Sequence, residues 1–186
     1  MSDIIQCITE PECWDFLNEW RKKPMTDAPR EDLKESDLKW EYLYDTFPSL
    51  RLTQGETIFR VHHGGCDEPE FADYEGYREN QRELFNEAHD KWEGEQDRSS
   101  IRFDRHWVSF TKDPQVIRSP YFQSKGMRGF VIVASANKAV DISELPALGF
   151  IQDEQEVVAP LDKAQVVEIL PFAKFKEQYC KSKSEE

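Results

Sequence analysis

Apolar residues recur at helical spacing near the start of the chain. Thr9 can cap a helix, Glu12 completes a capping box, and Pro11 falls in the first turn, where its missing N–H is harmless. Apolar residues then follow the helical repeat at Cys13, Phe16, Leu17 and Trp20. We expect Pro24 to end this helix. A second helix is predicted over 30–47, with an apolar face of Trp40, Leu43, Tyr44 and Phe47, and Pro48 closes it.

Strand patterns dominate the later part of the chain. Short β-branched and aromatic runs predict strands over 57–61, 106–111, 128–134, 154–159 and 163–170. One further helix is predicted over 74–92, and polar or Pro- and Gly-containing loops are predicted over 94–100 and 141–150. Helices that precede strands favour the α+β class with mostly antiparallel sheets rather than alternating βαβ units.

Charge and cysteine usage narrow the class of protein. The net charge of −13 argues against a stable nucleic-acid partner, which needs a basic surface. Cys7, Cys13, Cys66 and Cys180 show no zinc-ligand spacing, so we expect reduced thiols and a cytoplasmic protein. No apolar run is long enough to cross a membrane, and no classical signal peptide is visible. Export by a signal-independent route stays open.

Arg60 interrupts the apolar strand predicted over 57–61. A guanidinium in such a place is costly unless it is paired. Its partner is either a carboxylate in a structural ion pair or an anionic ligand such as a pyrophosphate.

Two hydroxyls share one face of the strand predicted over 106–111. Ser109 and Thr111 alternate with Val108 and Phe110 under the two-residue period of a strand. They could orient a catalytic group, although Ser and Thr are also ordinary residues of edge strands. His62, His63 and His106 lie near these motifs in sequence and are expected to be neutral core or surface residues.

Glu154 and Glu156 are separated by one residue at the start of a predicted strand. In an extended strand they would point to the same face. They are either an acidic catalytic pair or a solvated acidic edge.

Taken together, these motifs resemble those of ADP-ribosyltransferases of the arginine–serine–glutamate type, as in bacterial toxins and vertebrate ecto-enzymes. The match is Arg60, then Ser109-Phe110-Thr111, then Glu154-Gln155-Glu156 followed by apolar residues and Pro160. The motifs are spaced by about 50 and about 45 residues, and the resemblance covers about residues 52–172. Each motif is short, so its specificity depends on order, spacing and strand context.

The resemblance implies a division of the chain. Residues 1–50 would form a helical segment packed on the core. Residues 51–175 would form an ADP-ribosyltransferase-like catalytic domain of two packed, mostly antiparallel sheets. Residues 176–186 would be a charged, disordered tail.

The resemblance also implies a mechanism without a metal, in which NAD is the co-substrate. Glu156 would be the essential carboxylate, Glu154 would deprotonate the acceptor, and Ser109 would position the catalytic glutamate. Arg60 would bind the NAD phosphates or hold the ribose pocket. Further contacts to NAD would come from the backbone of Val61, from Phe110 and from Thr111, and Phe150 would touch the target.

Two positions depart from the family pattern. Val61 stands where members often have Gly after the Arg, and the middle motif is Ser-Phe-Thr instead of Ser-Thr-Ser. Neither change removes a group that the chemistry requires.

The resemblance implies transfer of ADP-ribose to a target, with a protein arginine as the expected acceptor. The same motifs would serve an NAD glycohydrolase, or a transferase that acts on nucleic acid or a small molecule. Two alternatives are not enzymes. One is a binding module on a degenerate transferase fold, and the other is an acidic protein that mimics nucleic acid.

Overall fold

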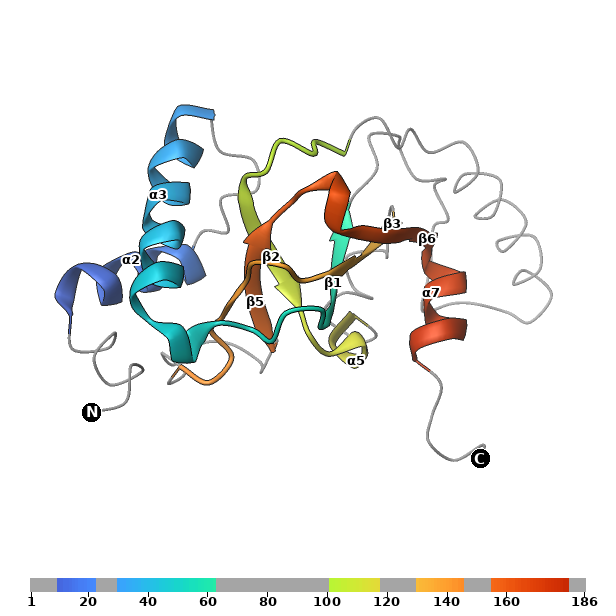
Figure 1. Ribbon diagram of the computed structural model, residues 1–186. Coiled ribbons are helices and arrows are strands. Elements are labelled where there is room, and N and C mark those ends of the chain that lie inside the picture. Colours follow the sequence, from blue (N-terminus) through green and yellow to red (C-terminus); the bar gives the residue numbers. More distant parts are fainter. Residues whose placement is uncertain (1–9, 23–29, 63–100, 118–129, 146–154, 181–186) are drawn as a thin grey trace, which may run out of the picture.

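The computed structural model describes residues 10–22, 30–62, 101–117, 130–145 and 155–180 (Figure 1). The helices are α2 (Pro11–Lys22), α3 (Arg30–Thr46), α5 (Pro114–Ile117) and α7 (Phe172–Tyr179), with short 3₁₀ turns η2 (Pro48–Leu50) and η4 (Lys163–Gln165). The strands are β1 (Thr57–His62), β2 (Trp107–Thr111), β3 (Phe130–Ser135), β4 (Val140–Asp141), β5 (Glu156–Pro160) and β6 (Val166–Pro171).

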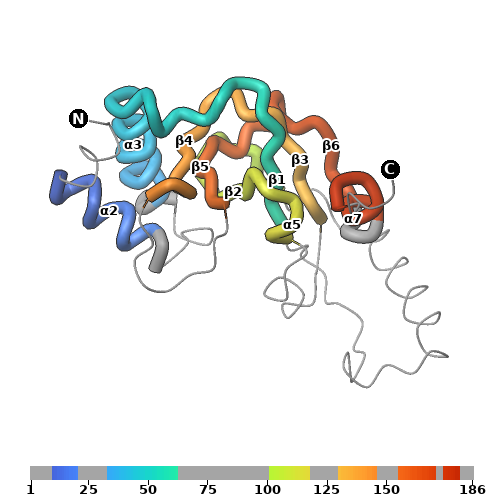
Figure 2. Tube along the Cα trace, turned by 90° about the horizontal axis from the view of Figure 1, so that it is seen from below, coloured from blue at the N-terminus to red at the C-terminus, as the bar shows by residue number. Residues whose placement is uncertain are grey.

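All the described strands join in one antiparallel sheet with the order β4-β5-β2-β1-β3-β6. This confirms the α+β class. The expected pair of packed sheets is not seen in the described part of the chain, because β3 and β6 extend the sheet beyond β1. Figures 1 and 2 show α2 and α3 at the β4–β5 end of the sheet and α7 at the β6 end.

Helices α2 and α3 form where the apolar pattern predicted them. Pro11 is the first residue of α2, and α3 ends at Thr46, just before Pro48 begins η2. Their apolar faces meet the sheet in one buried cluster, which includes Leu17, Trp40 and Trp107. The helix predicted over 74–92 lies outside the described residues.

The C-terminal part differs from the expectation. The predicted tail was wrong at its beginning, because α7 runs on to Tyr179. Phe175 and Cys180 are buried against Phe59 and Val131, so this short helix is anchored by apolar contacts. The expected strand over 163–170 begins only at Val166, after the turn η4, which Asp162 caps by accepting from the Ala164 amide.

Strand register defines two faces of the sheet. Phe59, Thr111 and Glu156 lie in one cross-strand row, so their side chains share a face. Trp107 and Val158 alternate onto that face too, and they contact the helices. We call it the helical face. Ile58, Phe110 and other apolar residues project from the opposite face into a separate cluster.

Candidate functional site

The three predicted motifs lie on neighbouring strands. Arg60 is on β1, Ser109 on β2 and Glu156 at the start of β5, and β2 lies between the other two. Two strand spacings separate the backbones of β1 and β5 by roughly 10 Å. The fold therefore gathers residues that are far apart in sequence into one patch of sheet.

Ser109 and Glu156 share the helical face. The register pairs Ser109 with Val158 and Thr111 with Glu156, so Glu156 lies one strand over from the segment that carries both hydroxyls. Side chains in such diagonal positions lie roughly 7–8 Å apart at their bases, within reach of one small ligand. The Ser109 side chain is partly buried at this position.

Arg60 ties β1 to β2 through the backbone. Its Nη1 donates a hydrogen bond of 2.7 Å to the Ser109 carbonyl oxygen. The two strands share the single register pair Phe59–Thr111, so the guanidinium binds this carbonyl beyond the point where the strands pair. This backbone partner adds to the two that the sequence suggested, a carboxylate and an anionic ligand, and both of these stay predictions.

Arg60 begins on the other face of the sheet from Glu156. Its neighbour Phe59 shares the row of Thr111 and Glu156, and strand alternation therefore directs Arg60 with Ile58 toward the opposite face. The guanidinium reaches the edge of β2 from that side. A role in bracing β2 fits this geometry better than a direct contact between Arg60 and Glu156.

Glu156 accepts a hydrogen bond from a residue outside the three motifs. The indole N–H of Trp20 on α2 donates to Glu156 Oε1 over 3.1 Å. From the sequence, Trp20 was only one member of an apolar helix face. The missed signal is the indole N–H itself, since a buried Trp usually needs a hydrogen-bond acceptor.

The backbone before Glu156 is not extended. Gln155 has φ of 46°, in the left-handed region that is unusual for residues other than glycine, and β5 begins at Glu156. We expected Glu154 and Glu156 to share a face because residues alternate along a strand. Such alternation requires an extended residue between them, and Gln155 is not extended. Glu154 and Phe150 lie outside the described residues.

The other predicted NAD contacts have local roles. Phe110 is buried in the cluster on the opposite face, so its side chain belongs to the core. Val61 packs against the cluster around Phe59 and Phe175. The Thr111 hydroxyl accepts from the Asp113 amide (3.1 Å) and lies 3.2 Å from the Asp113 carbonyl, which closes the turn after β2. Their part in NAD binding stays a prediction.

Helix α3 holds the start of β2 through two carboxylates one turn apart. Asp37 accepts from the Trp107 amide (2.9 Å) and contacts His106 Nδ1 (2.6 Å). Glu41 accepts from the Trp107 indole (3.2 Å) and pairs with Lys138. These contacts fix the strand that leads to Ser109. His106 is thus a partly buried residue of this contact between α3 and β2, which we call the seam.

A shallow cavity of about 170 Å³ lies at the far end of β2. Its lining includes Arg51, Lys112 and Asp141, and Lys112 and Asp141 form an ion pair of 2.7 Å. Asp141 pairs with Val157 and so projects away from the helical face. This cavity is smaller than the roughly 300 Å³ of ordinary ligand sites and contains none of the predicted catalytic residues. A dinucleotide-sized cleft over Ser109 and Glu156 stays a prediction.

Within the described ranges, no three or more His, Cys, Asp or Glu side chains are grouped as metal ligands. No helix in these ranges has the length and apolar character needed to cross a bilayer. Cys13 and Cys180 are buried, and neither forms a disulfide with another described residue.

Comparison with models of protein families, with curated proteins and with solved structures finds no match. The resemblance described above therefore depends on the motif residues and on the strands that carry them.

Proposed function

We propose that this protein cleaves NAD at the nicotinamide–ribose bond and transfers the ADP-ribose to a target, with a protein arginine as the acceptor. The observation that carries the proposal is the placement of Arg60, Ser109 and Glu156 on three adjacent strands, with Ser109 and Glu156 on one face. These are the residues of the arginine–serine–glutamate motif, in the same order along the chain.

The reaction needs a fixed negative charge. As the bond from the ribose to nicotinamide breaks, positive charge develops on the ribose, as in glycoside cleavage. A carboxylate held beside the ribose stabilises that charge in the transition state. Glu156 supplies this carboxylate, and the hydroxyl of Ser109 on the next strand binds a polar group of the nicotinamide-side ribose or of Glu156 itself.

Arg60 acts on the same site from the opposite face of the sheet. By binding the Ser109 carbonyl, its guanidinium holds the segment of β2 that presents the hydroxyl. Glu154 polarises the guanidinium of the acceptor, which is a weak nucleophile when protonated. Phe150 contacts the target protein.

The test is release of nicotinamide from NAD by the wild-type protein and by Glu156→Gln. We expect the wild-type protein to release nicotinamide and the variant to lose nearly all of this activity, because the neutral amide cannot balance the charge on the ribose. Glu144→Gln is the matched control, since Glu144 is exposed and lies outside the patch. An unchanged rate in Glu156→Gln, with the fold intact, would remove Glu156 from the mechanism.

Transfer is separated from hydrolysis by following labelled ADP-ribose with and without a protein acceptor. Glu154→Gln should leave NAD hydrolysis intact and reduce labelling of arginine. Equal loss of both activities would contradict the acceptor role of Glu154. Hydrolysis without any transfer would identify an NAD glycohydrolase instead.

A further inference from the structure

The hydrogen bond between Trp20 and Glu156 joins the N-terminal helices to the proposed catalytic carboxylate. The two residues are 136 positions apart in the chain, yet the indole N–H lies 3.1 Å from Glu156 Oε1. Trp20 is 3% exposed, whereas Glu156 is half-buried. The indole thus fixes a group that still reaches the surface of the helical face.

The ring of Trp20 is itself held rigidly. It packs edge-on against Trp40 at 4.9 Å between ring centres, and Trp40 stacks on Trp107 at 6.2 Å. Trp40 is fully buried. A side chain packed in this way has little freedom to change rotamer, so the direction of its N–H is set by the packing.

The same stack supports the strand that carries Ser109. Trp107 begins β2, two residues before Ser109 and on the same face, and it is bound by Asp37 and Glu41 of α3. Trp20, Trp40 and Trp107, which we call the aromatic column, therefore position both the carboxylate on β5 and the hydroxyl on β2.

We propose that Trp20 is a positioning residue for Glu156, so that helix α2 is part of the active site. The indole holds Oε1 and leaves Oε2 to face the ribose. This inference rests on the proposed cleavage of NAD. It adds a group outside the three motifs and gives the N-terminal helices a function in the reaction.

A purely structural role is the competing explanation. In that case Glu156 only provides the acceptor that a buried indole N–H requires, and loss of the bond would reduce stability alone. The two explanations differ in kinetics. A positioning contact that matters in the transition state changes kcat and leaves KM for NAD unchanged.

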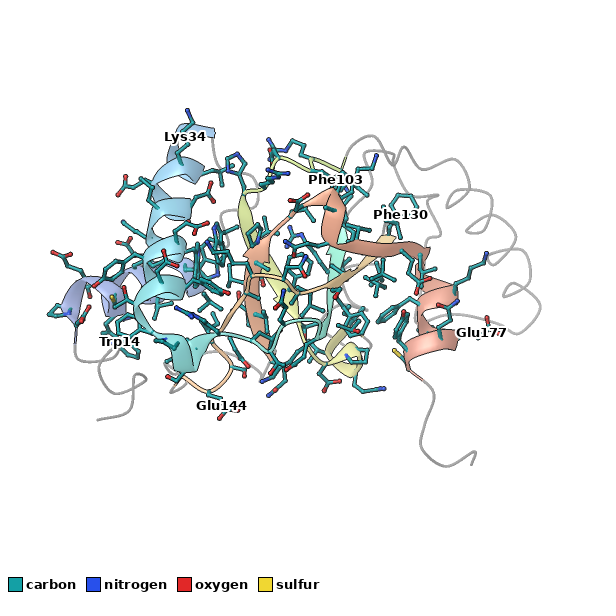
Figure 3. All side chains as sticks on the ribbon, viewed as in Figure 1. Trp14, Lys34, Phe103, Phe130, Glu144 and Glu177 are labelled. Atoms are coloured by element: carbon teal, nitrogen blue, oxygen red, sulfur yellow. The ribbon has the colours of Figure 1, made fainter. Side chains whose placement is uncertain are left out.

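The experiment compares Trp20→Phe with the wild-type protein in nicotinamide release. Phenylalanine retains an aromatic ring against Trp40 and lacks the N–H. Trp14→Phe is the matched control, because Trp14 lies on the same helix toward the outer edge of the molecule (Figure 3) and is only partly buried. We expect Trp20→Phe to lower kcat at least about tenfold with KM unchanged, because loss of a hydrogen bond to a charged group in the transition state is large enough for a change of this size. Trp14→Phe should keep the wild-type kcat.

A second measurement does not depend on activity. In the NMR spectrum of the full chain, the indole N–H signal of Trp20 should move when Glu156 is replaced by alanine, while that of Trp14 stays in place. A shift supports the contact even if Trp20→Phe fails to fold, and an unmoved Trp20 signal overturns the inference.

The outcomes separate this inference from the proposed function. A wild-type kcat in folded Trp20→Phe overturns the positioning role and leaves NAD cleavage standing. A wild-type protein that releases no nicotinamide overturns the proposed function, and the positioning role with it.

Discussion

Two side chains in the described part of the protein form hydrogen bonds that could not be predicted from the residues around them in the sequence. Arg60 binds a backbone carbonyl on the adjacent strand, and Trp20 binds a carboxylate on β5. Each contact satisfies a polar group in a region of low exposure, where an unmet hydrogen bond is costly. The strain at Gln155 occurs immediately before Glu156. Non-glycine residues in the left-handed region often accompany functional sites, which agrees with the proposed site.

Replacing Arg60 with alanine should destabilise the protein by about 1–3 kcal/mol, because the partly buried Ser109 carbonyl loses a charged donor. Urea unfolding of the variant and the wild-type protein measures the difference. Arg102→Ala is the control, since Arg102 is exposed. Equal stability of Arg60→Ala and wild type would contradict the bracing role.

Tyr179 gives a prediction for alkaline conditions. Its hydroxyl donates to Glu168 Oε1 at 2.5 Å, and this bond together with burial raises the pKa of Tyr179 from 10.0 to about 12. The folded state thus favours the neutral phenol, so the stabilisation is complete below pH 10 and is lost as the pH rises toward 12.

Tyr179→Phe should therefore be less stable than the wild-type protein at neutral pH, by about 1 kcal/mol. The difference in unfolding free energy between the two proteins should shrink above pH 10. Denaturant unfolding at a series of pH values checks this. A difference that stays constant above pH 10 would show that the bond to Glu168 does not govern the ionisation.

At the scale of elements, helix α3 is held against the start of strand β2 by two carboxylates. Asp37 and Glu41 are one helical turn apart and so face the same strand, where both bind Trp107. The amphipathic pattern of α3 predicted its apolar face. The acidic residues beside that face also dock it on the strand leading to Ser109.

Asp37→Ala should destabilise the protein by about 1–3 kcal/mol, since the Trp107 amide and the His106 ring lose their acceptor. Asp45→Ala, at an exposed site on the same helix, should have little effect. Thermal or urea unfolding of the two variants measures the contrast. Similar stability of both would mean that the seam does not hold α3 to the sheet.

The sequence predicted elements better than contacts. Helix α3 and strands β1 and β2 lie where periodicity and Pro48 placed them, because their apolar residues face a core. Helix α7 was missed since it is short and contains lysine at two of its eight positions, and its described apolar contacts are those of Phe175 and Tyr179. The start of β5 was misjudged because a left-handed Gln155 leaves no sign in composition. The Trp20–Glu156 bond depends on long-range packing that spacing along the chain does not encode.

On the scale of the whole molecule, the helical face carries two separate clusters. One joins α2 and α3 to β2, β4 and β5, and the other joins α7 to β1, β3 and β6. Ser109, Thr111 and Glu156 lie on β2 and β5, which belong to the first cluster, and β1 of the second cluster is the next strand after β2. Rigid packing on both sides suits a site that must hold a carboxylate and a hydroxyl in fixed geometry.

Trp40 is the centre of the first cluster, and Trp40→Ala should cost about 3–5 kcal/mol through lost burial and the cavity left behind. The midpoint of urea unfolding reports this loss. Leu38→Ala serves for comparison, because Leu38 is exposed on the same helix. A loss no larger than that of Leu38→Ala would show that the aromatic column does not support the sheet.

The most direct test of the central claim is a crystal structure of Glu156→Gln with NAD bound. We predict that the nicotinamide-side ribose lies on the helical face, against residue 156 and the Ser109 hydroxyl. NAD bound on the opposite face beside Ile58, or crystals that take up no NAD at saturating concentration, would contradict the proposed site.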